Sequence, residues 1–209
     1  MDVVVFGAGG HAKVVIDVLR ASGHRVVAVF DDNPALHQQK FHGCDVLGAS
    51  ADLAAFAKRQ HVQHFFVAIG NNRLRQQLAQ QWSQLGLTAA TAIHPSAVIA
   101  DSVIIGAGTV VMAGVCINAD TVIGEQVIIN TRASIDHDCR IETAVHIAPA
   151  VALCGGVTVG ERTLIGVGTS VIPLIHIGCD VVIGAGSAVV CSISSGQTAV
   201  GVPARCFSR

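Results

Sequence analysis

The sequence predicts an N-terminal α/β domain followed by a parallel β-helix, and two observations lead to this prediction. Over roughly the first 90 residues, short apolar runs that end in glycine or polar residues alternate with segments of helical apolar spacing. From about residue 95 the pattern changes to an unbroken period of six. We therefore expect two domains, residues 1–92 and residues 93–209, the second ending in a short tail.

The first domain is expected to contain a parallel sheet covered by helices. The predicted strands lie in "DVVVFGAGG", "HRVVAVFDDN" and "HFFVAIGNN". The predicted helices lie in "HAKVVIDVLRASG", "SADLAAFAKRQ" and "RLRQQLAQQWSQLG". Because strands and helices alternate along the chain, the strands are expected to pair in parallel, with helices as crossover connections.

The second domain is defined by its aliphatic repeat. Every sixth residue from Ile99 to Val189 is Ile, Val or Leu, in sixteen consecutive positions. Such a hexapeptide period is typical of a parallel β-helix, whereas an antiparallel sandwich would not keep it over so long a stretch. We expect the aliphatic side chains to point inward and residues 18 apart to stack. Glycine often follows the aliphatic residue, at Gly106, Gly124, Gly160, Gly166, Gly178 and Gly184. We expect these glycines to relieve turns of positive φ.

The composition excludes several classes of protein. With 51% hydrophobic and 13% charged residues and a net charge of -1, the chain has no basic surplus for nucleic acid. It shows no apolar run of membrane-spanning length and no secretory signal, so we expect a cytoplasmic protein with no membrane partner. Seven cysteines without a CxxC pair argue against a disulfide framework and against a zinc ribbon.

A glycine loop lies between the first predicted strand and helix. The sequence "GAGGHA", from Gly7 to Ala12, fits G-x-G-x-x-A, and the second strand ends at Asp31 and Asp32. Backbone N–H groups at a helix N-terminus favour phosphate, and an acid after the second strand can bind ribose hydroxyls. The domain ends before a second mononucleotide half, which argues against NAD. A purely structural strand–turn–helix remains the alternative.

The hexapeptide array together with "VFGAGGHAKVVIDVL" and "VFDD" resembles a known family. This family comprises sugar O/N-acetyltransferases related to sialic-acid O-acetyltransferase and to enzymes that acetylate UDP-4-amino-sugars. The resemblance covers essentially the whole chain. It implies a Rossmann-like nucleotide-sugar-binding domain, a left-handed β-helix, a homotrimer with active sites between subunits, and acetyl-CoA as co-substrate. It implies no metal.

The resemblance also assigns catalytic residues. It places the catalytic base at the first histidine of "IDHDCRIE", which is His137. A neutral imidazole suits proton acceptance near pH 7, and Asp138 could orient the ring and stabilise the imidazolium. The period places His137 at a corner and His146 facing outward, so neither is a core histidine. Asn130 and His146 match family residues beside the reacting groups.

Binding residues follow from the same resemblance. Val167 and Ala185 stack in one corner column, and His137 and Gly155 stack in another. The residues implied to contact acetyl-CoA are His146, Gly155, Val167 and Ala185. Those implied to contact the nucleotide sugar are Gly9, Gly10, His11, Asp31, Asp32, Gly70, Asn71, Asn130 and His146.

The expected function is acetyl transfer from acetyl-CoA to the 4-amino group of a nucleotide-linked 4-amino-4,6-dideoxy sugar in surface-glycan synthesis, with UDP as the nucleotide. The alternative within this class is O-acetylation of sialic acid or another sugar hydroxyl. A metallohydratase similar to the γ-class carbonic anhydrases needs closely spaced histidines, whereas His137 and His146 are nine residues apart. A non-catalytic nucleotide-sugar sensor would lack the base.

Overall fold

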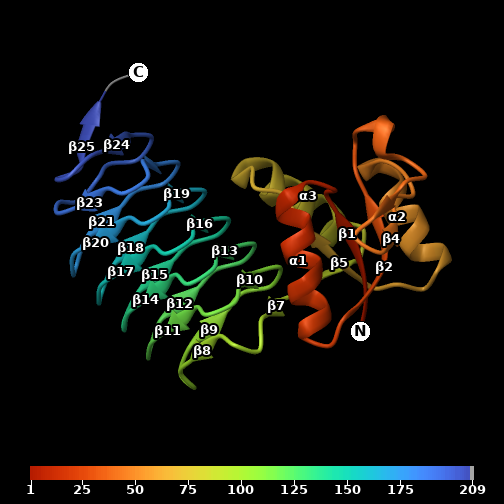
Figure 1. The fold of residues 1–209 in the computed structure, drawn as a ribbon, viewed down its shortest axis with the longest axis horizontal. Coiled ribbons are helices and arrows are strands. Elements are labelled where there is room, and N and C mark those ends of the chain that lie inside the picture. The colour runs from red at the N-terminus through yellow and green to blue at the C-terminus, as the bar shows by residue number, and fades with distance from the viewer. Residues whose placement is uncertain (208–209) are drawn as a thin grey trace. The chain divides into compact units, whose positions relative to one another are not determined.

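The computed structural model describes residues 1–207 and divides the chain into two compact units, Met1–His94 and Pro95–Arg209 (Figure 1). The first unit contains helices and a parallel sheet, and the second is a β-helix. This architecture confirms the predicted fold class. Within residues 1–207, no helix is both long and apolar enough to cross a bilayer.

The first unit is built on a parallel sheet of order β2-β1-β5-β6. Its strands are β1 (Asp2–Phe6), β2 (Arg25–Phe30), β5 (His64–Val67) and β6 (Thr88–Ala89). Its helices are α1 (Gly10–Ala21), α2 (Ser50–Arg59) and α3 (Asn72–Gln84). Every strand and helix expected from the sequence is present. Strand β6 was not predicted. The chain also forms a 3-10 turn (Pro34–Leu36), a hairpin of β3 (Lys40–Phe41) and β4 (Cys44–Asp45), and β7 (Ala92–Ile93), none of which was predicted.

The core of the first unit is centred on Trp82 of α3, which is 1% exposed. Phe6 of β1 and Phe65 of β5 meet its ring edge to face, at centroid distances of 5.6 Å and 5.3 Å. Edge-to-face aromatic contacts add to the burial of apolar area. They hold α3 against β5 and against the end of β1, from which the glycine loop emerges.

The second unit coils through three sheets, which we call the first, second and third faces (Figure 1). The first face comprises β10 (Val110–Val111), β13 (Ile128–Ile129), β16 (His146–Ile147), β19 (Leu164–Ile165), β22 (Val182–Ile183), β24 (Thr198–Val200) and the antiparallel β25 (Arg205–Phe207). The second comprises β8 (Val98–Ile99), β11 (Cys116–Ile117), β14 (Ser134–Ile135), β17 (Ala152–Leu153), β20 (Ser170–Val171) and β23 (Ala188–Val189). The third comprises β9 (Ile104–Ile105), β12 (Val122–Ile123), β15 (Arg140–Ile141), β18 (Thr158–Val159) and β21 (His176–Ile177).

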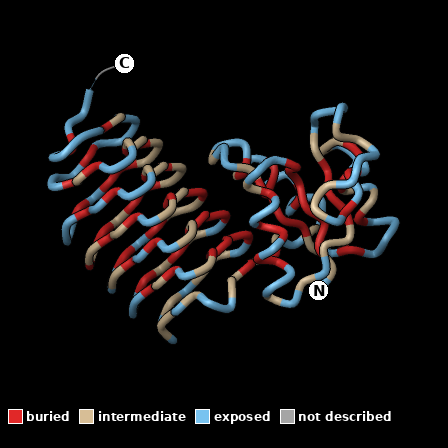
Figure 2. Tube along the Cα trace, viewed as in Figure 1, coloured by how far each residue is buried: buried red, intermediate tan, exposed pale blue. Residues whose placement is uncertain are grey.

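The observed register confirms the period. Each two-residue strand from β8 to β23 ends at one of the sixteen aliphatic positions, and partners lie 18 residues apart, as Ile129 pairs with Ile147. The aliphatic residues at these positions from Val111 to Val189 are buried. Figure 2 shows buried segments recurring in successive coils. Ile99 and Ile105, in the first coil, are partly exposed.

The role predicted for the recurrent glycines was wrong. Gly106 and its equivalents do not adopt positive φ, which instead falls two residues later, at Gly108 and at non-glycine residues such as Asp138. Glycine is needed at position 106 because a Cβ there would lie 2.5 Å from the carbonyl carbon of Gly124 in the next coil. Close stacking of backbones, rather than turn conformation, explains this part of the pattern.

Candidate active site

The turn that follows β14 carries the predicted catalytic pair. The Nδ1 atom of His137 lies 2.6 Å from Oδ2 of Asp138, and the two side chains are 60% and 65% exposed. Asp138 has a φ of 59°, a left-handed conformation that Asp tolerates better than most residues. Because a carboxylate can only accept, Nδ1–H donates to it. Nε2 is then the nitrogen that can take a proton.

The backbone of this turn is held by the coils on either side. The N–H of Asp138 donates to the carbonyl of Ala119 in the coil before it (3.0 Å), and the N–H of Gly156 in the coil after it donates to the carbonyl of His137 (2.9 Å). The N–H of His137 donates to Oδ1 of Asp136 (2.9 Å). The turn therefore has little freedom, although its side chains face solvent.

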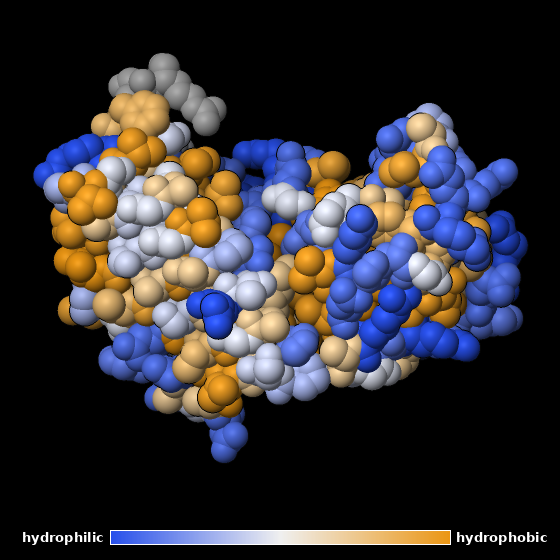
Figure 3. All heavy atoms as spheres, viewed as in Figure 1, coloured by the Kyte–Doolittle hydropathy of each residue, from blue (hydrophilic) through white to orange (hydrophobic). Residues whose placement is uncertain are grey.

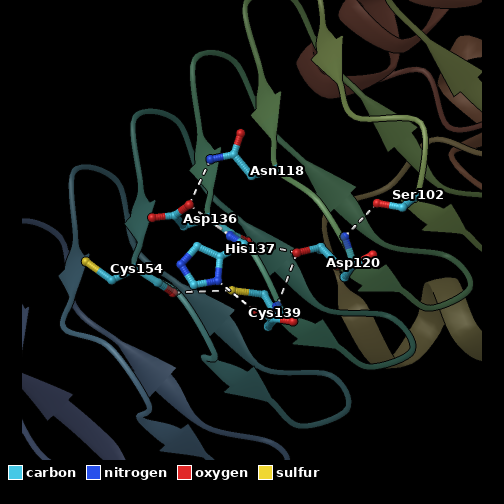
Figure 4. Close-up of polar contacts among 9 residues, drawn as sticks. Ser102, Asn118, Asp120, Asp136, His137, Cys139 and Cys154 are labelled. Atoms are coloured by element: carbon cyan, nitrogen blue, oxygen red, sulfur yellow. Dashed lines mark hydrogen bonds and ion pairs between the residues drawn. The ribbon is translucent and has the colours of Figure 1, made fainter.

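The electrostatics of the turn favour a protonated ring. The hydrogen bond that His137 donates to Asp138, and then the negative charge of Asp136, raise the pKa of His137 above its ordinary value of 6.5. The pKa of Asp136 is lowered, first by its hydrogen bond from Asn118 and then by the N–H of His137 (Figure 4). The neutral, proton-accepting form of His137 is therefore expected to dominate only above its raised pKa.

Gly155 lies one coil beyond His137 in the same corner column. A Cβ at this position would come within 2.6 Å of Cε1 and 2.7 Å of Nε2 of the imidazole. Real Cβ atoms do not approach other atoms so closely, so a side chain here would displace the ring. Glycine at position 155 thus leaves the space that the imidazole occupies.

A second group of predicted residues lies on and beside the first face. His146, on β16, is half-buried, and its Nε2 lies 3.3 Å from Nδ2 of Asn130. Val167 and Ala185 follow β19 and β22 and are exposed at the corner between the first and second faces. Asn130 follows β13 at the same corner.

The structure does not bring the two groups together within one chain. His137, Asp138 and Gly155 lie at the corner between the second and third faces. In a three-sided coil this corner is opposite the first face, which carries His146. A single chain therefore contains two parts of the predicted site, on different sides of the β-helix.

The glycine loop of the first unit is tied to the end of β2. Oδ2 of Asp31 accepts the N–H of Ala8 (2.7 Å), and Oδ1 accepts the N–H of Asn33 (2.9 Å). Gly9 is the N-cap of α1 and Gly10 its first residue, and both are exposed with open space around them. Asp31, predicted to contact the nucleotide sugar, thus already serves to hold the loop.

Other predicted binding residues cap helices. Oδ1 of Asp32 accepts the N–H of Ser50 (2.7 Å), at the first residue of α2. Asn71 is the N-cap of α3 and accepts the N–H of Leu74 (3.0 Å). Gly70, just before it, has no atoms within 4 Å of where a Cβ would be. The side chains of Asp32 and Asn71 thus each bond to the N-terminal turn of a helix, and both residues follow strands of the same sheet.

Arg75 was not singled out in the sequence, although it is part of this region. It is 1% exposed, and its guanidinium donates to the carbonyl of Ile69 (3.1 Å) and to Oδ1 of Asn72 (2.9 Å). Burial lowers the pKa of Arg75 to about 9. Burial, and then the charge of Arg75, lower the pKa of His11 to about 4. The available signal was its spacing, three residues before the buried Leu78 on the apolar face of α3.

The structure offers no resident metal site in residues 1–207, where no three His, Cys, Asp or Glu side chains are grouped to hold an ion. All seven cysteines are free thiols.

Comparison with known proteins decides the family. Residues 2–82 match the model of the PglD N-terminal domain. The chain is 31% identical to GDP-perosamine N-acetyltransferase of Escherichia coli O157:H7 over 170 residues, which cover 78% of the chain and 75% of that protein. The chain belongs to the hexapeptide-repeat sugar acetyltransferase family.

Other known proteins match the whole chain or about half of it. A mutant of perosamine N-acetyltransferase from Caulobacter crescentus, in complex with CoA and GDP-perosamine, is 47% identical and has a TM-score of 0.96, covering 100% of this chain and 98% of that one. UDP-N-acetylbacillosamine N-acetyltransferase of Bacillus subtilis (strain 168) is 42% identical over 107 residues, which cover 48% of the chain. The match spans 46% of that relative's length, so the chain spans under half of it.

Proposed function

We propose that this protein transfers the acetyl group of acetyl-CoA to the amino group of a nucleotide-linked 4-amino-4,6-dideoxy sugar. The observation that supports this most strongly is the exposed His137–Asp138 pair, 2.6 Å apart, in a chain of this family. The relatives named above are N-acetyltransferases for GDP-perosamine and UDP-N-acetylbacillosamine, which favours an amine over a hydroxyl acceptor. Their nucleotides differ, so GDP and UDP are both candidates.

The residues suggest a simple sequence of proton transfers. The acceptor amine attacks the thioester carbonyl carbon, and a C–N bond forms as the nitrogen becomes positively charged. Nε2 of His137 takes one proton from that nitrogen, while Asp138 stabilises the resulting imidazolium through Nδ1–H. The C–S bond then breaks, and His137 returns the proton to the departing sulfur, so that CoA leaves as the thiol and the base is regenerated.

Two corners of the β-helix carry the residues to which we assign the binding of acetyl-CoA. Gly155 presents no side chain beside the imidazole, and a Cβ there would fill the space against Cε1. Val167 and Ala185, at the other corner, are small or apolar and exposed. We assign donor contacts to these three residues and to His146, because the extended pantetheine arm of acetyl-CoA can lie against exposed backbone and apolar side chains at a coil edge.

We further propose that the site is completed by a second copy of the chain, in a homotrimer. His137 and the pair of Asn130 and His146 lie on different sides of one β-helix, so a neighbouring subunit is needed to bring them together. Large apolar side chains reach the surface of the β-helix (Figure 3), including Val98 (67% exposed) and Ile104 (62%). Such residues are common where subunits meet.

For the nucleotide-sugar acceptor we propose the glycine loop and the neighbouring strand ends. Gly9 and Gly10 expose the N-terminus of α1, where backbone N–H groups favour a diphosphate. We assign His11, Gly70 and Asn71 to the same binding surface for the nucleotide sugar. Asp31 and Asp32 keep unused lone pairs, so they can accept from ligand hydroxyls while they hold the loop and α2.

The acceptor class is tested by release of free thiol from acetyl-CoA. The acceptors to compare are GDP-linked and UDP-linked 4-amino-sugars, their 4-hydroxy counterparts, and free sialic acid. We expect rapid release with one or both amino-sugars and background release with the others. Release with a hydroxyl acceptor alone would overturn N-acetylation.

The shared site is tested by mixing two inactive variants. His137→Ala removes the base, and Asn130→Ala with His146→Ala alters the opposite face. If each site is built from two chains, refolded mixtures contain some sites with both wild-type halves and regain activity. A mixture that stays as inactive as its components, while forming the same oligomer, would contradict the proposal.

A further inference from the structure

In two turns of the β-helix, a side-chain oxygen accepts the backbone N–H of the next residue, but the two side chains differ. Oδ1 of Asn130 accepts the N–H of Thr131 (2.8 Å), and Oδ1 of Asp136 accepts the N–H of His137 (2.9 Å). Each acceptor directly follows its strand, β13 or β14. Because the neutral amide of Asn130 makes this hydrogen bond, the bond itself does not require a charged residue.

The carboxylate of Asp136 is held in place by the preceding coil. Nδ2 of Asn118, 18 residues earlier in the same column, donates to Oδ1 of Asp136 (2.8 Å). Figure 4 shows Asn118 directed at Asp136, which lies beside the imidazole of His137. The hydrogen bond fixes a negative charge next to the ring rather than leaving it free to turn into solvent.

A second bond to this turn is not special to it. The hydroxyl of Thr121 donates to the carbonyl of Asp136 (2.8 Å) and accepts the N–H of Cys139 (3.1 Å). Thr163 makes the same two bonds at a different corner, to Gly178 (2.7 Å) and from Val181 (3.1 Å). The threonine bonds are therefore part of the β-helix construction, and the Asn118–Asp136 pair is what distinguishes the turn of His137.

We propose that Asp136, held by Asn118, is a positioning residue that stabilises the protonated form of His137 during acetyl transfer. Asp138 meets the ring directly through Nδ1, whereas Asp136 acts on it through the backbone N–H and through its charge. Both carboxylates become more favourable neighbours when the ring takes the amine proton, so they stabilise the transition state more than the ground state. The proposal rests on His137 being the base of the proposed function.

The surroundings of the ring support an effect of Asp136 in particular. From the same turn, Asp136, Asp138 and the buried thiol of Cys139 lie near it; Asp120 lies in the coil before and Cys154 in the coil after. The pKa of His137 is raised by Asp138 and then by Asp136. Asp120, which is exposed, does not contribute to this shift and so offers a matched control carboxylate.

The test is an NMR titration of His137, assigned by its loss in His137→Ala, together with the pH dependence of kcat/KM. In Asp136→Asn we expect a lower His137 pKa and an acidic limb moved to lower pH in parallel. The amide keeps the bond to the His137 N–H but loses the charge, so the plateau rate should fall only modestly, by up to about threefold. Asp136→Ala also loses this bond, and its plateau should fall by about tenfold or more.

Asp120→Asn removes a similar charge from the same corner and is expected to leave the His137 pKa unchanged. The proposal is overturned if Asp136→Asn leaves the His137 pKa in place, or if Asp120→Asn moves it equally. The titration does not depend on turnover. If His137→Ala were active, the assignment of the base would fail, while a shifted pKa in Asp136→Asn would still show the influence of Asp136 on the ring.

Discussion

The glycine loop of the first unit and the His137 turn of the second are both held by an aspartate carboxylate, but they expose different groups. In the glycine loop, the carboxylate of Asp31 holds the backbone at Ala8, and the N-terminus of α1 is left exposed. In the His137 turn, the neighbouring coils and the carboxylate of Asp136 hold the backbone, and the side chains of His137 and Asp138 are exposed. The first arrangement suits the binding of an anion, and the second suits proton transfer.

Among the variants that keep His137 and compare its turn with the glycine loop, Gly155→Ala is expected to lose the most activity. The new Cβ would lie 2.6 Å from Cε1 of His137, so the ring must move. We expect kcat to fall by about 100-fold, because misplacement of a base by about an ångström is costly. Steady-state kinetics with acetyl-CoA and an amino-sugar acceptor would measure this.

Gly196→Ala is the control for a general loss of stability in the β-helix. Gly196 has a φ of 74° and open space around it, so alanine should cost about 1 kcal/mol of stability without changing kcat. Equal losses of kcat in both variants would mean that the effect of Gly155→Ala is not exerted through His137.

Asp31→Ala should weaken the glycine loop. Two backbone N–H groups lose their acceptor, which we expect to cost about 1–3 kcal/mol of stability in the first unit and to raise KM for the nucleotide sugar about tenfold. The effect on kcat should be small. Denaturation followed by fluorescence of Trp82, the sole tryptophan, reports this unit.

The matched control is Asp45→Ala, which removes an exposed ion pair with Lys40 in the same unit. Exposed pairs contribute little, so its melting curve and KM should match those of the wild type. If Asp31→Ala were as harmless as Asp45→Ala, the loop would not depend on Asp31.

The pH dependence of stability offers a further test of the first unit, through His11 beside the glycine loop. Its pKa is lowered from 6.5 to about 4 in the folded chain, so the unfolded chain takes up the proton first as pH falls. Stability from this group is complete above pH 6.5 and is lost as pH falls towards 4, by up to about 3 kcal/mol. In His11→Asn, urea denaturation at pH 7 and pH 4.5 should show a smaller difference than in the wild type. An unchanged difference would contradict the burial of a neutral His11.

The β-helix could be predicted strand by strand because its backbone stacking imposes a residue type at every sixth position. The same pattern did not reveal why glycine follows the aliphatic residue, since close backbone approach and positive φ both favour glycine. In the first unit, β6, β7 and the β3–β4 hairpin were missed because a two-residue strand outside a repeat is too short to show a period.

The site was predictable in part. The period alone places His137 at a corner and His146 outward, and both placements agree with the structure. The internal use of Asp31 and Asp32 was not predictable, because a carboxylate after a strand is equally suited to a ligand or to a loop. Arg75 was missed because arginine is usually a surface residue, and only its spacing from the buried Leu78 indicates that it faces the core.

Turnover of His137→Ala tests most directly whether this turn is the catalytic centre. The assay is thiol release from acetyl-CoA with the best amino-sugar acceptor, and the melting temperature and oligomeric state of the variant serve as controls. We predict that kcat/KM falls by about 100- to 10,000-fold while both controls match the wild type, as expected for loss of a general base. Turnover close to that of the wild type would contradict the assignment of His137 and place the chemistry elsewhere in the protein.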